Sequence, residues 1–226
     1  MVTTVKSPYS DEQIVVWLRG LLTIAWADGH FDEEEKALIA ELTQSELVPE
    51  TELGGIEKIT PDELAIVLGQ EPEIAENFMR TAVMVAIADG VYSSPEDDIL
   101  HQFCVALDLP PKILESLRLT LHYRPENSGA PTSDFAQYDH SAAPLRPLQD
   151  WLDRLEVHDP RLARFLCKMI PPQCPFERKV TLFGQKVVRI PPMCKLNPLY
   201  DQLVGLRFRA LTYLADDCRE DVSKYC

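Results

Sequence analysis

The chain has 226 residues, of which 46% are hydrophobic, and its formal net charge is −14. This length suits one large domain or two small ones, and the hydrophobic content is enough for a packed core. The negative charge argues against a nucleic-acid-binding protein, because contacts to phosphate groups need a basic surface. Residues 1–9 lack the basic and apolar pattern of a signal peptide, and no stretch approaches the roughly 18–20 apolar residues that span a bilayer. We therefore expect a soluble cytoplasmic protein without a transmembrane segment.

The charge is unevenly distributed along the chain. Residues 1–123 contain 7 Lys and Arg against 23 Asp and Glu, whereas residues 144–226 contain 14 against 10. The boundary falls at residues 124–143, which are rich in Pro, Ser, Gly and Ala and lack apolar periodicity, as expected of an exposed linker. Modules of opposite charge can dock on each other or can steer separate partners, and the sequence leaves both open.

The front module, residues 1–123, contains an internal repeat. Residues 27–31 align with residues 88–92, and the similarity relates the segments at about 14–45 and 75–106. Each copy begins with an apolar helical segment, whose spacings of three and four predict one buried face in a shared bundle core. These apolar residues are Ile14, Trp17, Leu18, Leu21, Leu22 and Ala25 in the first copy, and Ile74, Phe78, Ala82, Val85 and Ala86 in the second.

Each copy then turns at an Asp-Gly pair and continues into a second helix. A glycine just after a helix favours a left-handed C-cap, and Asp32-x-x-Glu35 and Ser93-x-x-Glu96 are typical of capping boxes. The same corners also gather carboxylates that could bind a divalent cation, although their spacing is not that of an EF-hand. The candidate carboxylate ligands are Asp28, Asp32, Glu35, Asp89 and Glu96.

Two further helices complete the front module. Thr60-Pro61-Asp62-Glu63 predicts a capped helix that ends before Gly69, and Pro110-Pro111 predicts the start of a last helix through Leu121. The repeated pattern Ala-Asp-Gly-x-aromatic-x-x-x-Glu over residues 10–121 resembles the TerB-like family, which is named for tellurite resistance. That resemblance implies a compact helical bundle whose acidic residues bind divalent cations, and an interaction or sensing module that is not a catalyst.

The rear module, residues 144–226, is also predicted to be mainly helical. The apolar spacing predicts helices over 147–155, 160–169 and 198–215, and Arg207 and Arg209 on the last could pair with acidic helices of the front module. Between the last two helices, two β-branched runs flank Gly184-Gln185, which predicts a β-hairpin with its turn at this pair. The fold class we expect is mainly α, with a duplicated helical bundle and a small helical module that carries one β-hairpin.

Five of the six cysteines lie in the last sixty residues. The sequence Ile-Pro-Pro-x-Cys occurs on both sides of the predicted hairpin, so that the hairpin would bring Cys174 and Cys194 together. Two converging thiolates are half of a tetrahedral metal site, and further cysteines could complete it around zinc or an iron–sulfur cluster. Redox-active thiols and buried structural thiols remain open as alternatives. The candidate thiolate ligands are Cys167, Cys174, Cys194, Cys218 and Cys226.

The residues around both Ile-Pro-Pro-x-Cys copies, together with Gly205-Leu-Arg-Phe-Arg-Ala-Leu211, closely resemble the "Mo-dependent nitrogenase, C-terminal" family. This resemblance covers residues 144–226 and implies a cyanobacterial source. The family label does not imply nitrogenase activity, because catalytic nitrogenase subunits are far longer and hold their clusters in large α/β domains.

The sequence offers little support for an enzyme. No histidine pair has the helical spacing of a zinc protease, and neither a phosphate-binding glycine loop nor a Gly-x-Ser-x-Gly motif is present. We therefore expect a non-enzymatic interaction or metal-responsive protein with a protein partner, in which an acidic helical module is tethered to a cysteine-bearing one. The alternative is an iron–sulfur or thiol redox protein that transfers electrons or senses oxidants.

Overall fold

The structure is a computed structural model that describes residues 7–27, 58–88, 92–118, 145–170, 178–182, 185–190 and 199–225. These residues are mainly helical, so the predicted fold class is confirmed. None of the described helices combines the length and the apolar content needed to cross a bilayer. The helices are α1 (Asp11–Ala25), α3 (Pro61–Leu68), α4 (Pro72–Ala86), α5 (Ser94–Ala106), α6 (Lys112–Arg118), α7 (Arg146–Leu152), α8 (Pro160–Met169) and α10 (Tyr200–Thr212).

Side-chain caps determine where several helices begin. Ser93 and Glu96 form the predicted capping box of α5, and Thr60 and Glu63 form that of α3. Asp159 precedes α8 and caps it, and its fully buried carboxylate accepts hydrogen bonds from two backbone amides of the first turn. Such caps satisfy amide groups that have no partner within the helix. The predicted bounds of α3 and α8 therefore agree with the structure.

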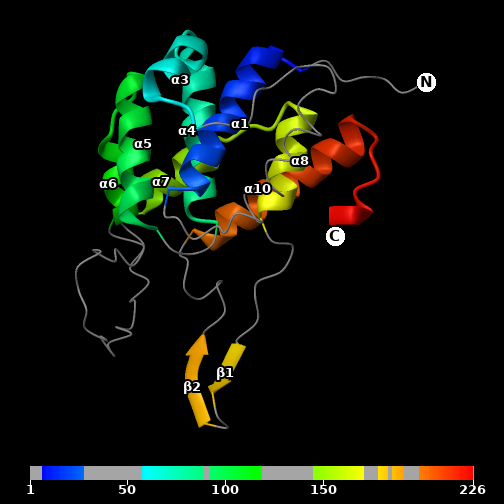
Figure 1. The fold of residues 1–226 in the computed structure, drawn as a ribbon. Helices are drawn as coiled ribbons and strands as arrows, with labels where there is room; N and C mark the ends of the chain where they lie inside the picture. Colours follow the sequence, from blue (N-terminus) through cyan, green and yellow to red (C-terminus); the bar gives the residue numbers. More distant parts are fainter. Residues whose placement is uncertain are drawn as a thin grey trace.

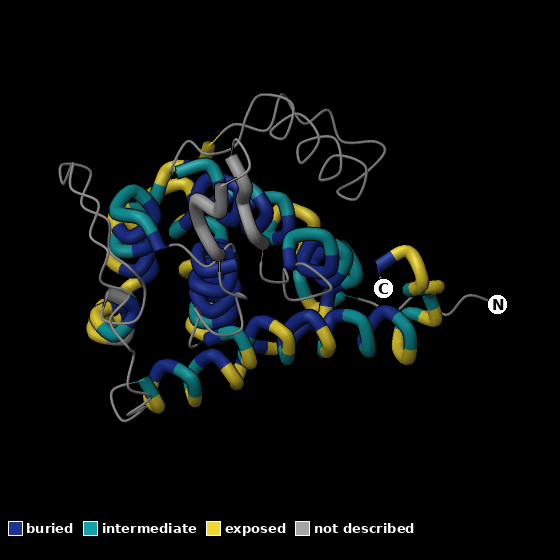
Figure 2. Tube along the Cα trace, turned by 90° about the horizontal axis from the view of Figure 1, so that it is seen from below, coloured by how far each residue is buried: buried dark blue, intermediate teal, exposed yellow. Residues whose placement is uncertain are grey.

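The core is built around α1 and α4, the two apolar segments that the repeat predicts. They pack against each other, with α3 and α5 beside them and α8 against α1 (Figure 1). The rings of Trp17, Phe78 and Phe103 stack edge to face, with centroids 5.7 and 5.9 Å apart. Within the helices, buried residues face the inside of the bundle and exposed residues face outward, and the connecting turns are also exposed (Figure 2). The buried apolar cluster includes side chains from both the front and the rear residues.

Gly20 on α1 lies directly against side chains of α3 and α4. A Cβ atom there would lie 2.7 Å from the Phe78 ring and 2.8 Å from a Leu64 methyl group. Gly205, on α10, is also helical, but a Cβ atom added there would meet no neighbouring atom within 4 Å. The two glycines therefore offer a matched pair of substitutions with opposite expected signs.

We expect Gly20→Ala to lower the free energy of unfolding by about 1–3 kcal/mol, because overpacking outweighs the helix propensity gained. Gly205→Ala should raise it by about 0.5–1 kcal/mol, since alanine restricts the unfolded chain at no steric cost. Urea denaturation of both variants measures these changes. Equal effects at the two positions would contradict the packing around Gly20.

In the rear part, α10 packs against α8 and ends earlier than the sequence predicts. The α-helix stops at Thr212 and continues as a π-helical turn over Tyr213–Asp217, followed by a 3-10 turn at Ser223–Tyr225. Apolar periodicity does not distinguish an α-helical turn from a π-helical one, which explains the difference. Helix α7 likewise ends at Leu152 and not at residue 155.

Among the residues that the structure describes, Arg207 and Arg209 bond to the rear part and not to the front helices, so the expected pairing is not found there. The buried guanidinium of Arg207 donates hydrogen bonds to the carbonyl oxygens of Cys167, Ile170 and Tyr225. Arg209 donates to the carbonyls that end α7 and follow it, Asp153 and Leu155, both at 2.9 Å. Both arginines therefore hold segments of the rear part together, because helix ends and turns present unpaired carbonyl groups.

Two strands, β1 (Arg178–Leu182) and β2 (Gln185–Ile190), pair in antiparallel fashion and extend away from the helices (Figure 1). Arg178 lies opposite Ile190, and the register shifts between Val180 and Thr181. Gln185 pairs with Leu182, so it belongs to β2 and not to the centre of a turn as predicted. The side chains of both strands, and Cys174 and Cys194 that flank them, lie outside the described residues.

Candidate functional site

The structure describes two of the five predicted thiolate ligands. Cys167 is buried on α8, and Cys218 follows the π-helical turn and is half-buried. The remaining three, Cys174, Cys194 and Cys226, lie outside the described residues. In the part of the chain that the structure describes, no three His, Cys, Asp or Glu side chains are grouped to hold a metal ion. The shared thiolate centre therefore stays a prediction.

The surroundings of Cys218 favour the neutral thiol. Burial raises its pKa most, and a hydrogen bond with Tyr213 opposes this in part. The pKa of Tyr213 is itself raised, by burial first and by the neighbouring thiol second, while its hydroxyl donates to the His158 carbonyl at 2.8 Å. A protonated thiol is a weak nucleophile, so Cys218 is not activated for exchange chemistry in this state.

Among the predicted carboxylate ligands, only Glu96 lies within the described residues. Its carboxylate accepts hydrogen bonds from the Ser93 amide at 2.8 Å and from the Ser93 hydroxyl at 2.7 Å. Glu96 is only 5% exposed, so the carboxylate that takes part in the capping box is buried. Its structural role at the start of α5 is thus clear, while the other candidates, Asp28, Asp32, Glu35 and Asp89, lie outside the described residues.

Asn77 on α4 joins the front part to the rear part. Its side-chain amide donates to the Glu156 carbonyl at 2.8 Å and accepts from the Glu156 amide at 3.0 Å, and also donates to the Tyr9 hydroxyl at 3.2 Å. The single side chain of Asn77 therefore satisfies both the backbone carbonyl and the backbone amide of Glu156. Asn77 itself is buried, with 5% of its surface exposed. Nearby, Arg161 of α8 forms an ion pair with Asp11 of α1 at 2.6 Å.

Arg80, one turn after Asn77, makes a second junction with α7. Its Nε donates to the Trp151 carbonyl at 3.0 Å, and its guanidinium lies 5.3 Å from the centroid of the Trp151 ring. Its other end forms an ion pair with Glu76 on the same helix. This stacked arrangement is a cation–π contact, and it fixes the orientation of the indole against α4.

The end of α5 supplies the opposite wall of a pocket next to Trp151. Asp108 has a positive φ of 55°, and the amides of Asp108 and Leu109 return to the carbonyls of Val105 and Cys104. This is a Schellman motif, and it turns the chain so that Leu109 and Pro110 lie over the helix end. The Cys104 thiol donates to the Leu109 carbonyl at 3.3 Å.

Because glycine adopts a positive φ without steric cost, we expect Asp108→Gly to raise the free energy of unfolding by about 0.5–1 kcal/mol. Thermal unfolding of the variant measures this, with Asp98→Gly on the same α5 helix as a control that should be destabilising. Destabilisation by both substitutions would contradict the left-handed conformation of Asp108.

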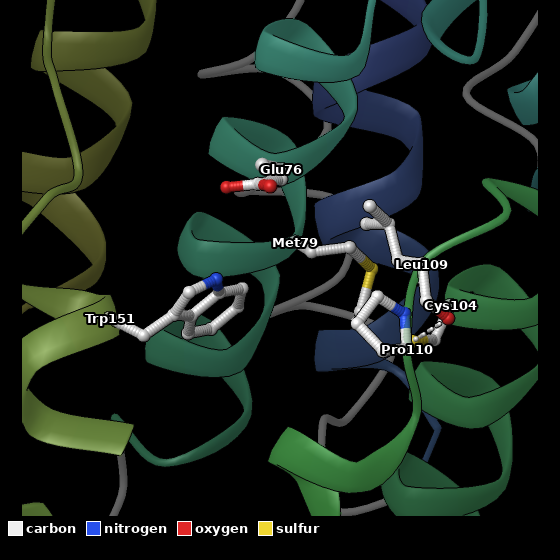
Figure 3. Close-up of a pocket in the computed structure, with 6 residues that line it drawn as sticks. All are labelled: Glu76, Met79, Cys104, Leu109, Pro110 and Trp151. Carbon is white, nitrogen blue, oxygen red and sulfur yellow. Dashed lines mark hydrogen bonds between the residues drawn. The ribbon is translucent and has the colours of Figure 1, made fainter. Parts of the chain in front are cut away.

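The pocket itself has a volume of about 150 Å³ (Figure 3). Trp151 from the rear part faces Met79 on α4, with Glu76 one turn earlier on the same helix (Figure 3). The Leu109–Pro110 segment and Cys104 close the other side. The walls are thus mainly apolar, and they come from both the front and the rear part of the chain.

Sequence reasoning missed this pocket. Its residues come from α4, the end of α5 and α7, and no short motif links segments so far apart in sequence. Cys104 is the one cysteine that lies outside the rear cluster. The signal that could have directed attention here is Leu109-Pro110-Pro111, which marks a fixed turn directly after an apolar helix.

Burial raises the pKa of the Cys104 thiol. Above the ordinary thiol pKa of about 8.5, the unfolded chain loses the thiol proton while the folded chain keeps it. The free energy of unfolding therefore has its full value below that pH and falls above it. We expect the free energy of unfolding to decline as the pH rises above about 8.5, and to decline less steeply in Cys104→Ala. Urea titrations at several pH values measure both slopes. A steeper decline in the variant would contradict this assignment.

The fold and the junction together define a mainly helical protein in which an apolar pocket lies between an acidic front part and a rear part. A family model described as "Mo-dependent nitrogenase C-terminus" matches residues 144–226, so the rear part of the chain is similar to this domain. This is the segment that contributes α7, α8 and α10. Comparisons with curated proteins and with solved structures gave no match. The resemblance of residues 10–121 to the TerB-like family stays a prediction.

Proposed function

We propose that this chain is a non-enzymatic interaction protein, in which the helical front module supports a rear module that binds a partner protein through α10. The single observation that carries the proposal is an exposed apolar pair on that helix. Val204 and Phe208, one turn apart, are 46% and 68% exposed. Exposed aromatic side chains that lie beside a second apolar residue are typical of binding surfaces.

The opposite face of α10 supports this assignment. Leu203, Leu206 and Ala210 are buried against the rear core, and Arg207 is fixed by three carbonyl groups. Phe208 is therefore presented on a helix that cannot rotate to bury it. A rigid aromatic anchor loses little conformational entropy when a partner covers it, which favours binding.

The charge of the rear module suggests the chemistry of the partner. Residues 144–226 carry 14 basic against 10 acidic side chains, while the rest of the chain is strongly acidic. A protein with an apolar cleft for the Phe208 ring and an acidic rim would be attracted to the rear module and repelled by the front module. We therefore propose a partner protein with an apolar cleft and an acidic rim.

A photo-crosslinking amino acid at position 208 tests this proposal in cells. Val105 on α5 is also 68% exposed and provides a matched control position on the front part. We expect crosslinks to one acidic protein from position 208 and none to that protein from position 105. Identical crosslinks from both positions would contradict a binding face on α10.

The proposed function also includes regulation of partner binding by a metal ion or cluster bound to the cysteines of the rear module. If the thiolates of the rear module hold zinc or an iron–sulfur cluster, elemental analysis should find bound metal that is lost in the Cys174→Ser, Cys194→Ser double variant. Anaerobic purification distinguishes the two, since a cluster is coloured and zinc is not. A metal-free wild-type chain would remove metal control and leave the interaction function.

A further inference from the structure

We propose that the pocket between α4, the end of α5 and α7 binds a small neutral aromatic molecule of about one ring, and that this ligand strengthens the junction between the two parts of the chain. The proposal is independent of the binding face on α10. It rests on the size of the pocket, on the chemistry of its walls and on the two parts of the chain from which they come.

The volume matches one aromatic ring. An apolar cavity of about 150 Å³ accepts benzene, and the pocket here has about that volume, although it is partly open to solvent. A two-ring compound such as indole exceeds this volume and would leave one ring only partly buried. The size therefore favours a one-ring ligand, so that affinity should depend on the number of rings.

The chemistry of the walls favours an apolar, uncharged ligand. Met79, Leu109, Pro110 and the Trp151 ring supply apolar and aromatic surface, and methionine sulfur makes favourable contacts with rings. The thiol and the carboxylate at the lining already have partners in the protein. Cys104 donates to the Leu109 carbonyl, and Glu76 is paired with Arg80. A charged ligand would lose hydration without gaining a free counter-charge, so it should be excluded.

The ligand would contact both parts of the chain at once. Met79 and Cys104 belong to the front part, and Trp151 belongs to the segment that matches the Mo-dependent nitrogenase C-terminus model. A molecule that fills the gap between them binds only the docked arrangement. By mass action it must therefore stabilise that arrangement over any state in which α7 has moved away from α4.

Methionine methyl NMR on the unmodified protein tests binding without disturbing the fold. The side chains of Met79 and Met84 are both buried on α4, but only Met79 lines the pocket. Added toluene should shift the Met79 methyl signal saturably through the ring current, with half-saturation at about 0.1–1 mM. The Met84 signal should move little. A Met79→Leu variant assigns the signal by its disappearance.

Ligand size and charge provide the second arm of the experiment. Phenol should bind more weakly than toluene, because burial of its hydroxyl costs free energy, and indole and benzoate should bind at least tenfold more weakly than toluene. Met79→Ala enlarges the pocket and should bring indole binding close to that of toluene, while Met84→Ala should leave the preference for one ring unchanged. At ten times the dissociation constant, toluene should raise the Tm of the wild type by about 3–5 °C.

Two results would overturn the proposal. One is a Met79 signal that does not move up to the solubility limit of toluene. The other is an equal shift of Met79 and Met84, which would indicate non-specific partitioning into the core. Because the NMR arm uses the wild-type chain, neither result can be attributed to a variant that fails to fold.

Discussion

Replacing Arg207 by methionine should lower the free energy of unfolding by about 3–5 kcal/mol. The guanidinium donates to the carbonyls of Cys167, Ile170 and Tyr225 and is only 6% exposed. Hydrogen bonds from a charged donor contribute about 1.5–3 kcal/mol each, and a buried carbonyl left without its partner adds a desolvation cost. Methionine fills part of the volume but donates nothing. Chemical denaturation followed by circular dichroism measures the loss.

The matched control is Arg154→Met, because Arg154 is exposed after α7. This substitution should change stability by less than about 0.5 kcal/mol. Arg207→Lys should recover only part of the loss, since an ammonium group cannot reach three carbonyls in the planar geometry of a guanidinium. If Arg207→Met is as stable as Arg154→Met, the three-carbonyl arrangement is wrong.

We expect Asn77→Ala to lower the free energy of unfolding by about 2–4 kcal/mol and to loosen the junction between α4 and the rear part. The side-chain amide of Asn77, which is 5% exposed, satisfies both the carbonyl and the amide of Glu156, and alanine would leave both of these partly buried groups without their partner. Hydrogen exchange measured by mass spectrometry should show faster exchange in α7 and around residue 156. Unchanged exchange in α7 would contradict the coupling.

Asn77→Asp separates the loss of one donor from the loss of the whole side chain. The carboxylate can still accept from the Glu156 amide, but it faces the Glu156 carbonyl where Asn77 now donates at 2.8 Å. At neutral pH the variant should be at least as unstable as Asn77→Ala. Because a protonated carboxyl can donate, it should regain stability as the pH is lowered toward about 4. A variant that is most stable at neutral pH would refute this hydrogen-bond assignment.

Much of the helical architecture could be predicted from local sequence. The apolar spacing of α1 and α4 predicts which side chains are buried, and Leu18 and Phe78 are indeed buried. Caps were equally informative, because Thr60-x-x-Glu63 and Ser93-x-x-Glu96 each place a side chain where an unpaired amide needs one. Both signals are short-range, so they do not depend on how the helices are arranged.

The candidate site could not be predicted in this way. In the sequence Arg207 resembles any other surface charge, because only the fold shows that the carbonyls of Cys167, Ile170 and Tyr225 converge on it. The pocket depends on the docking of α7 against α4, and docking is set by contacts far apart in sequence. A charge pattern suggests attraction between modules, but it does not say which side chains meet. The convergence of Cys174 and Cys194 stays a prediction.

The most direct test of the account is a binding titration between this chain and the partner captured through position 208. Calorimetry should show that Phe208→Ser weakens binding by at least about 30-fold, which is the loss expected of a central aromatic anchor. Val105→Ser, which changes an equally exposed residue on the front part, should bind within about twofold of the wild type. If Phe208→Ser binds as tightly as Val105→Ser, the binding face is not on α10 and the proposed function is wrong.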